Sequence, residues 1–173
     1  QWFGIGAFTR FGMISEFGKD SIVATNAYSS ELKGMSITPT YAWKPDAKVS
    51  AALGAEINYV GLQLQKKMLT QYGYIDTKTE GDSVALGWNA AVNYEFDDKN
   101  EIGLVYRSRI THTMDADFTS ALFSTGAHGK VVLPDSYAIG YNHKFDDKTR
   151  VELNGTYTRW STYDKLLMTF DNG

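Results

Sequence analysis

The chain has 173 residues, a formal net charge of −3 at pH 7 and no cysteine. This length fits a single domain, the lack of a basic excess argues against nucleic acid as a partner, and the missing thiols exclude disulfides and cysteine-bound metals. Although 43% of the residues are hydrophobic, no apolar run approaches the roughly 20 residues of a membrane-spanning helix, which excludes a helical membrane protein.

Side chains that alternate between apolar and polar predict strands along most of the chain, because a period of two residues sorts them onto two faces. The first predicted strands are residues 1–12, 31–44 and 49–59, and residues 13–30 and 65–82 are predicted loops. Pro39 lies within the second strand, where its missing N–H donor predicts a bulge or a locally unpaired position.

Residues 83–112 show the clearest pattern, with two arms joined by a polar turn at 97–100. One face of the first arm consists of Val84, Leu86, Trp88, Ala90, Val92, Tyr94 and Phe96, whereas its other face is small or polar. Each arm has the length of about nine to eleven residues that a tilted bilayer-spanning strand needs, against about five or six in soluble proteins. An apolar exterior with a polar interior is typical of outer-membrane barrels.

A third loop is predicted at 114–130, followed by strands at 133–145 and 150–158. Tight turns follow aromatic strand ends at 45–48, 97–100 and 146–149, and the longer segments fall between them. This asymmetry predicts an all-β transmembrane antiparallel β-barrel with periplasmic turns and extracellular loops. The pattern gives seven strands. Since bacterial barrels have even strand numbers and an open sheet in lipid leaves edge groups unpaired, we expect a segment of a larger barrel.

Six short motifs stand in order along the chain: GIGAF with FGMISEF within 4–17, YAWKPDAKVSAALG at 41–54, GWNA at 87–90, YRS at 106–108, LPDS at 133–136 and WSTY at 160–163. They resemble, in the same order, motifs of the FadL-type (OMPP1/FadL/TodX) outer-membrane transporters of long-chain fatty acids and other hydrophobic compounds. The resemblance implies a barrel of about 14 strands with an N-terminal plug. Because the Asn-Pro-Ala motif of the plug and the later strands are not found here, residues 1–173 are predicted to be one β-barrel segment.

The resemblance also implies a function. We expect a passive channel in the outer membrane of a Gram-negative bacterium, in which a hydrophobic molecule is captured at the extracellular loops, crosses an apolar lumen and leaves sideways through the wall. Neither enzyme activity nor a cofactor is implied. The expected partners are outer-membrane lipids, lipopolysaccharide and a fatty acid or hydrocarbon ligand. The barrel is expected to be monomeric, and its loops also suit a phage or colicin receptor.

Candidate ligand-binding residues follow from the needs of an amphipathic ligand, whose carboxylate is costly to bury without a charged partner. Arg107 and Arg109, on the polar face of the strand after the central turn, are predicted to supply that partner. The alternative is that they pair across the lumen with Glu56 or Glu95. Near-helical spacing of Phe118, Leu122 and Phe123 predicts an outer apolar groove or, alternatively, a loop packed on itself.

No metal site or catalytic site is predicted. The histidines, His112, His128 and His143, are far apart in the sequence. Paired aspartates at 97–98 and 146–147 lie in tight turns, where Asp favours backbone hydrogen bonding. The Asp-Ala-Asp run at 115–117 is interpreted as part of a solvated loop, and Lys144 and Glu152 as part of a polar network near a periplasmic turn. No Ser-His-Asp arrangement has supporting context.

Two other classes of protein compete with the channel. A small structural or adhesive barrel of about eight strands suits the length, but it should finish on an amphipathic strand with a terminal aromatic residue. A soluble lipocalin-like barrel would turn its apolar face inward and carry denser charge on the other face. Charge on a lipid-facing position costs about 2–4 kcal/mol at the bilayer midplane, and the middle of the apolar face in 83–112 has none.

Overall fold

The computed structural model of the chain describes residues 1–162 and 167–170. Its strands are β1 (Trp2–Phe8), β2 (Met13–Glu16), β3 (Ser29–Trp43), β4 (Val49–Thr70), β5 (Gly73–Asp97), β6 (Asn100–Arg107), β7 (Ile110–Ser120), β8 (Ser124–Leu133), β9 (Ser136–Lys144), β10 (Arg150–Thr158) and β11 (Leu167–Phe170). One short 3₁₀ helix, η1, covers Trp160–Thr162. Within the described residues, no helix has the length and apolar character needed to cross a membrane.

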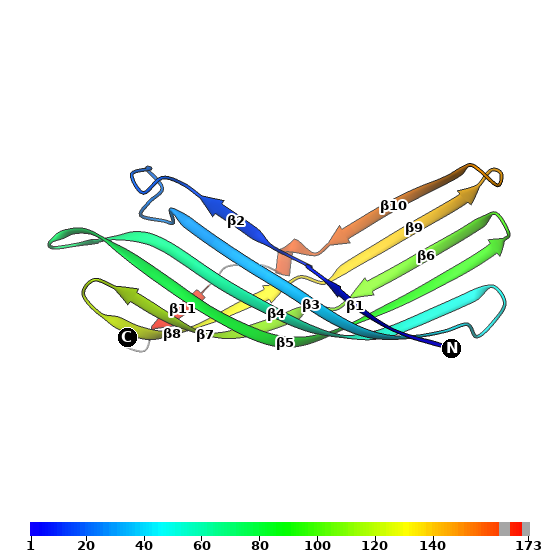
Figure 1. The fold of residues 1–173 in the computed structure, drawn as a ribbon, viewed down its shortest axis with the longest axis horizontal. Coiled ribbons are helices and arrows are strands. Elements are labelled where there is room, and N and C mark those ends of the chain that lie inside the picture. The colour runs from blue at the N-terminus through cyan, green and yellow to red at the C-terminus, as the bar shows by residue number, and fades with distance from the viewer. Residues whose placement is uncertain (163–166, 171–173) are drawn as a thin grey trace.

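All strands belong to one antiparallel sheet, and its main path runs β1-β3-β4-β5-β6-β9-β10. These seven neighbours are the seven strands that the sequence predicts, so the predicted fold class is confirmed. Figure 1 shows the turns between β3 and β4, β5 and β6, and β9 and β10 at the same end of the sheet, which we call the turn end. The opposite end, with tips at residues 71–72 and 121–123, is called the hairpin end.

Aspartates shape the turn end as the sequence predicts. The carboxylate of Asp97 accepts hydrogen bonds from the backbone N–H groups of Lys99 and Asn100, and Asp146 accepts them from Lys148 and Thr149. These bonds favour the charged form and hold the pKa of both carboxyl groups below the ordinary value. The first aspartate of each pair therefore serves turn formation.

The predicted loops at 65–82 and 114–130 are wrong, because both segments are paired strands. β4 and β5 stay in register as far as Thr70 and Gly73, and β7 pairs with β8 along its length. The predicted loop at 13–30 likewise contains β2. Outside the apolar band both faces of a strand can be polar, so the apolar alternation that marks a lipid-facing strand is lost there although the backbone pairing continues.

Pro39 interrupts the pairing of β3 with β4 without a bulge. Paired positions resume at Thr40 with Gly54 in the same register that holds at Ile37 with Ile57. Of the two alternatives that the sequence left open, the locally unpaired position is confirmed.

Large apolar side chains cover the outward face of the sheet. On β5 they include Val84, Leu86, Trp88 and Val92, all exposed. An aromatic row crosses four strands, with ring centroids 4.9 Å apart for Trp88 and Tyr106, 5.0 Å for Tyr106 and Tyr137, and 6.4 Å for Tyr137 and Tyr157. An exposed apolar exterior that carries a row of aromatic rings is the surface of a lipid-embedded barrel, and it excludes the lipocalin-like alternative.

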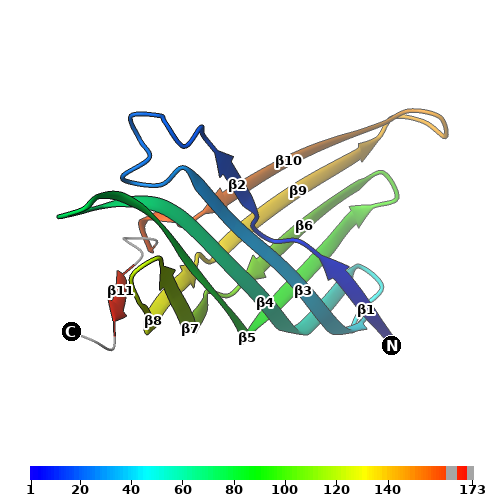
Figure 2. The same ribbon diagram turned by 60° about the vertical axis from the view of Figure 1, so that its left-hand side comes forward.

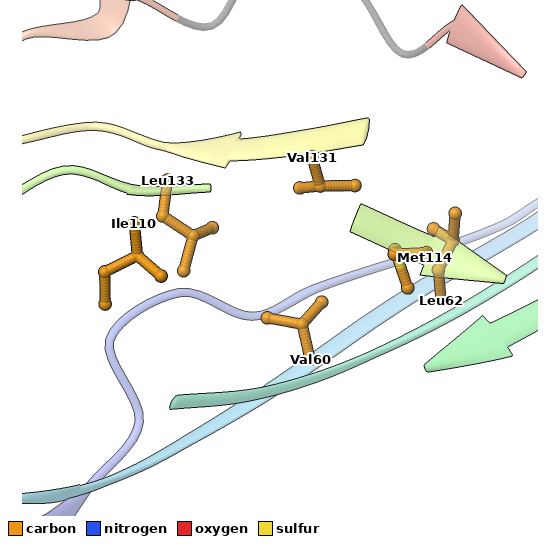
Figure 3. Packing of buried hydrophobic residues seen from close by; sticks show 6 residues of the cluster. All are labelled: Val60, Leu62, Ile110, Met114, Val131 and Leu133. Carbon is orange, nitrogen blue, oxygen red and sulfur yellow. The ribbon is translucent and has the colours of Figure 1, made fainter. Parts of the chain in front are cut away.

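The inner face of the hairpin end holds a buried apolar cluster, because the sheet bends at its middle and turns β4 toward β7 and β8 (Figures 1 and 2). Figure 3 shows its six side chains pointing toward one another: Val60, Leu62, Ile110, Met114, Val131 and Leu133. Phe11 and Leu32 pack against this cluster from the side. The interior therefore has an apolar compartment above a polar one.

Candidate functional site

The wall is interrupted between β1 and β2, at residues 9–12. Both strands pair with β3, but Phe8 lies opposite Ser36 and Met13 opposite Leu32, so four residues of one strand face three of the other. A Cβ built on Gly34 would lie 2.7 Å from the carbonyl oxygen of Phe11. Since Gly34 alternates with outward-facing neighbours, residues 9–12 cross the inner face of β3. We call this segment the inward break; it is visible between β1 and β2 in Figure 2.

Two further interruptions lie at the same level, between β6 and β7 and between β8 and β9. At the first, Ser108 satisfies both backbone groups of Trp88 in the middle of β5: its N–H donates to the carbonyl of Trp88, and its Oγ accepts from the N–H of the same residue, both at 2.9 Å. At the second, the carbonyl oxygen of Asp135 accepts from the N–H of Arg159, just after β10, at 3.0 Å. The interruptions coincide with the bend of the sheet in Figure 1.

Arg10 of the inward break connects these interruptions. Its Nη2 donates to the carbonyl oxygens of Ser108 and Pro134, each at 2.8 Å, and its Nη1 lies 3.4 Å from a carboxylate oxygen of Glu56 on β4. The side chains of Arg10 and Glu56 are 4% and 0% exposed. Charges this deeply buried persist only when they are paired and hydrogen-bonded, as this pair is.

A chain of hydrogen bonds extends from Glu56 into the hairpin end. Ser36 Oγ donates to Glu56 at 2.7 Å, and the amide nitrogen of Asn58 donates to Ser36 Oγ at 2.7 Å. The amide oxygen of Asn58 is 2.8 Å from Nε2 of His112 on β7. Because that oxygen can only accept, Nε2 carries the hydrogen. The network thus links three elements around the inward break.

Arg107 lies where the sequence predicts, on the inner face of β6. Its guanidinium carbon sits 5.4 Å from the ring centroid of Phe8, a cation–π contact. The pairing alternative is wrong: Glu56 binds Arg10, and Glu95 binds Lys44 at 3.0 Å. Within residues 1–162 and 167–170, no carboxylate forms an ion pair with Arg107. It is a cation at the lumen with no acidic partner in the described chain.

Arg109 departs from the prediction that it shares the lumen face with Arg107. Six residues of β5, 83–88, face seven residues, 108–114, so the face alternation shifts by one after β6. Ile110 is buried on the inner side, and Arg109 is half exposed, 3.4 Å from a carboxylate oxygen of Asp135. The physical reason is the interruption at Ser108, which a periodic pattern does not reveal. A role of Arg109 in ligand binding stays a prediction.

Phe118, Leu122 and Phe123 lie at the hairpin end. The helical spacing predicted for them is wrong, because Phe118 belongs to β7 and the other two to the tip. Phe118 is buried on the inner face, Leu122 and Phe123 are exposed, and the two phenylalanine ring centroids are 5.5 Å apart. Strand-and-turn geometry therefore brings the rings together at the mouth of the apolar compartment.

The turn end of the interior is polar, as predicted near Lys144 and Glu152. Glu101 accepts hydrogen bonds from Asn142 at 2.6 Å and Asn93 at 3.3 Å, and Glu152 accepts one from Asn154 at 3.0 Å. In the part of the chain that the structure describes, no group of three His, Asp or Glu side chains is placed to hold a metal ion.

The alternation of side chains does not reveal three features of this site: Arg10, its pairing with Glu56, and the burial of His112. A signal for Arg10 exists: in the sequence it continues the alternation of Gly4, Gly6 and Phe8, within a predicted strand, residues 1–12, that otherwise carries no charge. A charged side chain on an inner face is costly to bury alone, so it predicts a partner of opposite charge across the lumen.

A curved antiparallel sheet with an apolar exterior, short turns at one end and a polar lumen defines the wall of an outer-membrane β-barrel. Residues 2–173 match the family model described as "Outer membrane protein transport protein (OMPP1/FadL/TodX)", and the chain belongs to this family. Its location is the outer membrane of Gram-negative bacteria.

Curated relatives agree with this assignment. Outer membrane protein P1 of Haemophilus influenzae is 24% identical over 210 residues, which cover 98% of this chain and 45% of the relative. A long-chain fatty acid transport protein of Escherichia coli is 26% identical over 113 residues, covering 54% of this chain and 25% of that protein. The chain spans less than half the length of these relatives.

Solved structures share the fold. A Pseudomonas aeruginosa FadL homologue superposes with a TM-score of 0.87 at 14% identity, covering 98% of this chain and 48% of that one. The Ralstonia pickettii toluene transporter TbuX gives a TM-score of 0.81 at 15% identity, covering 97% of this chain and 54% of that one.

Proposed function

We propose that this chain forms part of an outer-membrane channel for passive uptake of long-chain fatty acids or other hydrophobic compounds. The observation that carries the proposal is the inward break at 9–12, which interrupts the wall beside a buried apolar compartment. The names of relatives, a long-chain fatty acid transport protein and a toluene transporter, supply the ligand class. We expect a monomeric barrel among outer-membrane lipids and lipopolysaccharide. Use of its tips by a phage or colicin stays a separate prediction.

Capture is proposed to begin at Phe118, Leu122 and Phe123. The exposed surface of Leu122 and Phe123 at the tip leads through the buried Phe118 toward the buried cluster on the inner faces of β4, β7 and β8. Transfer of an alkyl chain from water to such a surface is favourable by about 0.8 kcal/mol for each buried CH₂ group. A gradient of apolar surface from the tip inward thus draws the ligand without an energy source.

Release is proposed to be lateral, through the inward break. Because residues 9–12 leave the plane of the wall, they do not fill the ladder beside β3, and exposed apolar residues flank them on the outer face, namely Ile5 and Ile14. A ligand that leaves here enters the hydrocarbon layer directly and avoids the polar turn end of the lumen.

A carboxylate head group is proposed to bind Arg107. This cation has no acidic partner in the described chain, and the nearby guanidinium of Arg10 repels it, so an anion between them lowers the electrostatic energy. A charge-assisted hydrogen bond contributes about 1.5–3 kcal/mol. Hydrocarbon ligands have no carboxylate, so their binding should not depend on Arg107.

The test compares oleate and toluene binding to the intact protein in detergent. Arg107→Met should weaken oleate binding about tenfold or more, in line with one charge-assisted hydrogen bond, and leave toluene binding unchanged. Arg150→Met, on an exposed position of β10, is the matched control. Equal binding of oleate to wild type and Arg107→Met would remove Arg107 from the site, and a lack of binding for both ligands would contradict the proposed function.

A further inference from the structure

We propose that Arg10 is a positioning residue that clamps the inward break in place and thereby keeps the exit path open. The inference deepens the proposed function and rests on it for the effect on uptake, but the conformational part rests on the contacts of Arg10 alone. Three observations carry it: the acceptors that Arg10 binds, the support of its ionic partner, and the close backbone packing at the break.

The acceptors belong to the other two interruptions of the wall. Ser108 and Pro134 follow β6 and β8, and their carbonyl oxygens lie at positions where the strand ladders stop. Arg10 donates to both from a single nitrogen at 2.8 Å. A buried carbonyl without a donor is unfavourable, so each of these bonds ties the break to a distant part of the sheet.

The geometry requires the guanidinium fork. One nitrogen serves the two carbonyls while the other faces Glu56 at 3.4 Å. A lysine ammonium is a compact point charge, and it cannot reproduce two separate donor nitrogens in a fixed plane. Loss of the fork therefore releases at least one anchor even when the positive charge is kept.

Glu56 is held in place by contacts that do not involve Arg10. Ser36 donates to its other oxygen at 2.7 Å, and Asn58 and His112 continue the chain of hydrogen bonds. The carboxylate has no exposed surface and thus has little freedom to follow a displaced arginine. The anchor is fixed, and the break is the part that moves when the contact is lost.

The backbone of the break offers an independent way to displace it. The carbonyl of Phe11 lies so close to Gly34 that an added Cβ would stand 2.7 Å from its oxygen, and the ring of Phe11 packs edge-on against Trp160 at 5.4 Å between centroids. Gly34→Ala should therefore push residues 9–12 away from β3 while Arg10 remains. Gly6→Ala on β1 is its control, since a Cβ there meets nothing within 4 Å.

The first experiment measures the position of the break without any ligand. Residues 1–173 contain no cysteine, so this part of the protein needs no further change when nitroxide labels are placed on introduced cysteines at Thr9 and Leu86, both exposed, in the intact protein in bilayers. A second pair at Ile5 and Leu86 reports on the regular part of β1. Electron paramagnetic resonance then gives the distance distribution for wild type, Arg10→Leu, Arg10→Lys, Gly34→Ala, Gly6→Ala and Arg150→Lys.

We expect Arg10→Leu, Arg10→Lys and Gly34→Ala to shift or broaden the Thr9 distribution while the Ile5 pair stays sharp, which also shows that the barrel is folded. Gly6→Ala and Arg150→Lys should match wild type. An unchanged Thr9 distribution in Arg10→Leu would overturn the clamp, and so would equal broadening of both label pairs in all three variants, since Arg10 would then hold the whole barrel.

The second experiment measures uptake of a fluorescent long-chain fatty acid by cells. Variants that displace the break should lose several-fold in uptake rate while oleate binding to the detergent-solubilised protein falls less than twofold. Uptake at the wild-type rate with a displaced break would overturn the role of the clamp in release. If wild type takes up neither fatty acid nor toluene while the label distances shift as expected, the clamp stands and the proposed function fails.

Discussion

At the scale of single residues, Glu56 shows what it takes to bury a carboxylate in this sheet. Its carboxylate has no exposed surface and depends on Arg10 and Ser36 for its charge to be tolerated. The ion pair adds little stability in itself, because desolvation offsets most of the attraction. Removal of one partner, however, leaves the other as an unpaired buried charge. The contribution of this ion pair to the free energy of unfolding therefore becomes large only when one of its two residues is replaced.

Replacement of Glu56 tests this asymmetry. Glu56→Leu should lower the free energy of unfolding by about 3–5 kcal/mol, because it leaves the buried Arg10 uncompensated, whereas Glu56→Gln should cost less because its amide oxygen still faces Arg10. Denaturant unfolding of the intact protein in detergent measures the difference. Glu80→Gln, which removes a partly exposed pair with Lys78 at 2.6 Å, is the control and should change stability by less than about 1 kcal/mol.

Arg107 and Arg109 show how far sequence alone can place a site residue. Both have the same parity in the sequence, and the parity holds for Arg107 because β6 is regular up to that residue. One residue further the strand is interrupted, and Arg109 turns to the opposite side to meet Asp135. Arg10 was missed for a related reason: its acceptors are backbone carbonyls at strand interruptions, which leave no mark in side-chain alternation.

At the scale of elements, the interruption between β6 and β7 depends on close packing across β5. A Cβ built on Gly87 would stand 2.6 Å from Cγ1 of Ile110 and 3.0 Å from Oγ of Ser108. Ile110 is almost fully buried in the apolar cluster, so it cannot retreat without disturbing that cluster. A glycine is needed at this point because the inner face of β5 meets another strand end.

Gly87→Ala should accordingly destabilise the protein by about 1–3 kcal/mol through overpacking. Gly155→Ala is the matched control, because its Cβ would meet only Ile139 Cγ2 at an ordinary contact distance of 3.5 Å. Thermal or denaturant unfolding of both variants is the measurement. Equal stability of Gly87→Ala and wild type would mean that Ile110 moves aside freely, and the described packing would be wrong.

The elements that the sequence predicts well are those that touch lipid. Because the outward face must be apolar there, apolar residues recur at every second position of β5. Aspartates indicate the turns, where they accept backbone hydrogen bonds. The outer parts of β4, β5, β7 and β8 carry polar side chains such as Thr77 and Asp117, and polarity alone suggested loops. Only backbone pairing distinguishes an extended hairpin from a loop at such positions.

At the scale of the whole molecule, the outward face has an apolar band whose charged boundary is visible. On β5, Asp82 follows Val84 toward the hairpin end. Asp82 pairs on one side with Gly61 of β4, which in turn pairs with Lys33 of β3, and on the other side with Asp115 of β7. Charged residues thus begin together on three of these four strands, as expected where hydrocarbon gives way to head groups.

Trp88 should therefore lie in contact with lipid. In bilayers that contain brominated acyl chains, its fluorescence should be quenched, and Trp88→Phe should remove most of the quenched component. Trp160→Phe is the control: although 58% of Trp160 is exposed, its ring packs against Phe11, which contacts the buried cluster on the inner face, so it should contribute little to quenching by lipid. Equal quenching in wild type and Trp88→Phe would contradict the placement of the apolar band.

The paired hairpins beyond this band have a practical consequence. Thr70 and Gly73 still face each other at the tip of β4 and β5, where Gly73 adopts a φ of 106°, and only residues 71–72 separate the strands. The tip is exposed and makes no contact with the apolar cluster, and exposed loop tips tolerate inserted sequence. A short foreign epitope inserted between Gln71 and Tyr72 would be carried on a paired hairpin above the cell surface, where antibodies could reach it on living bacteria while the barrel wall below stays intact.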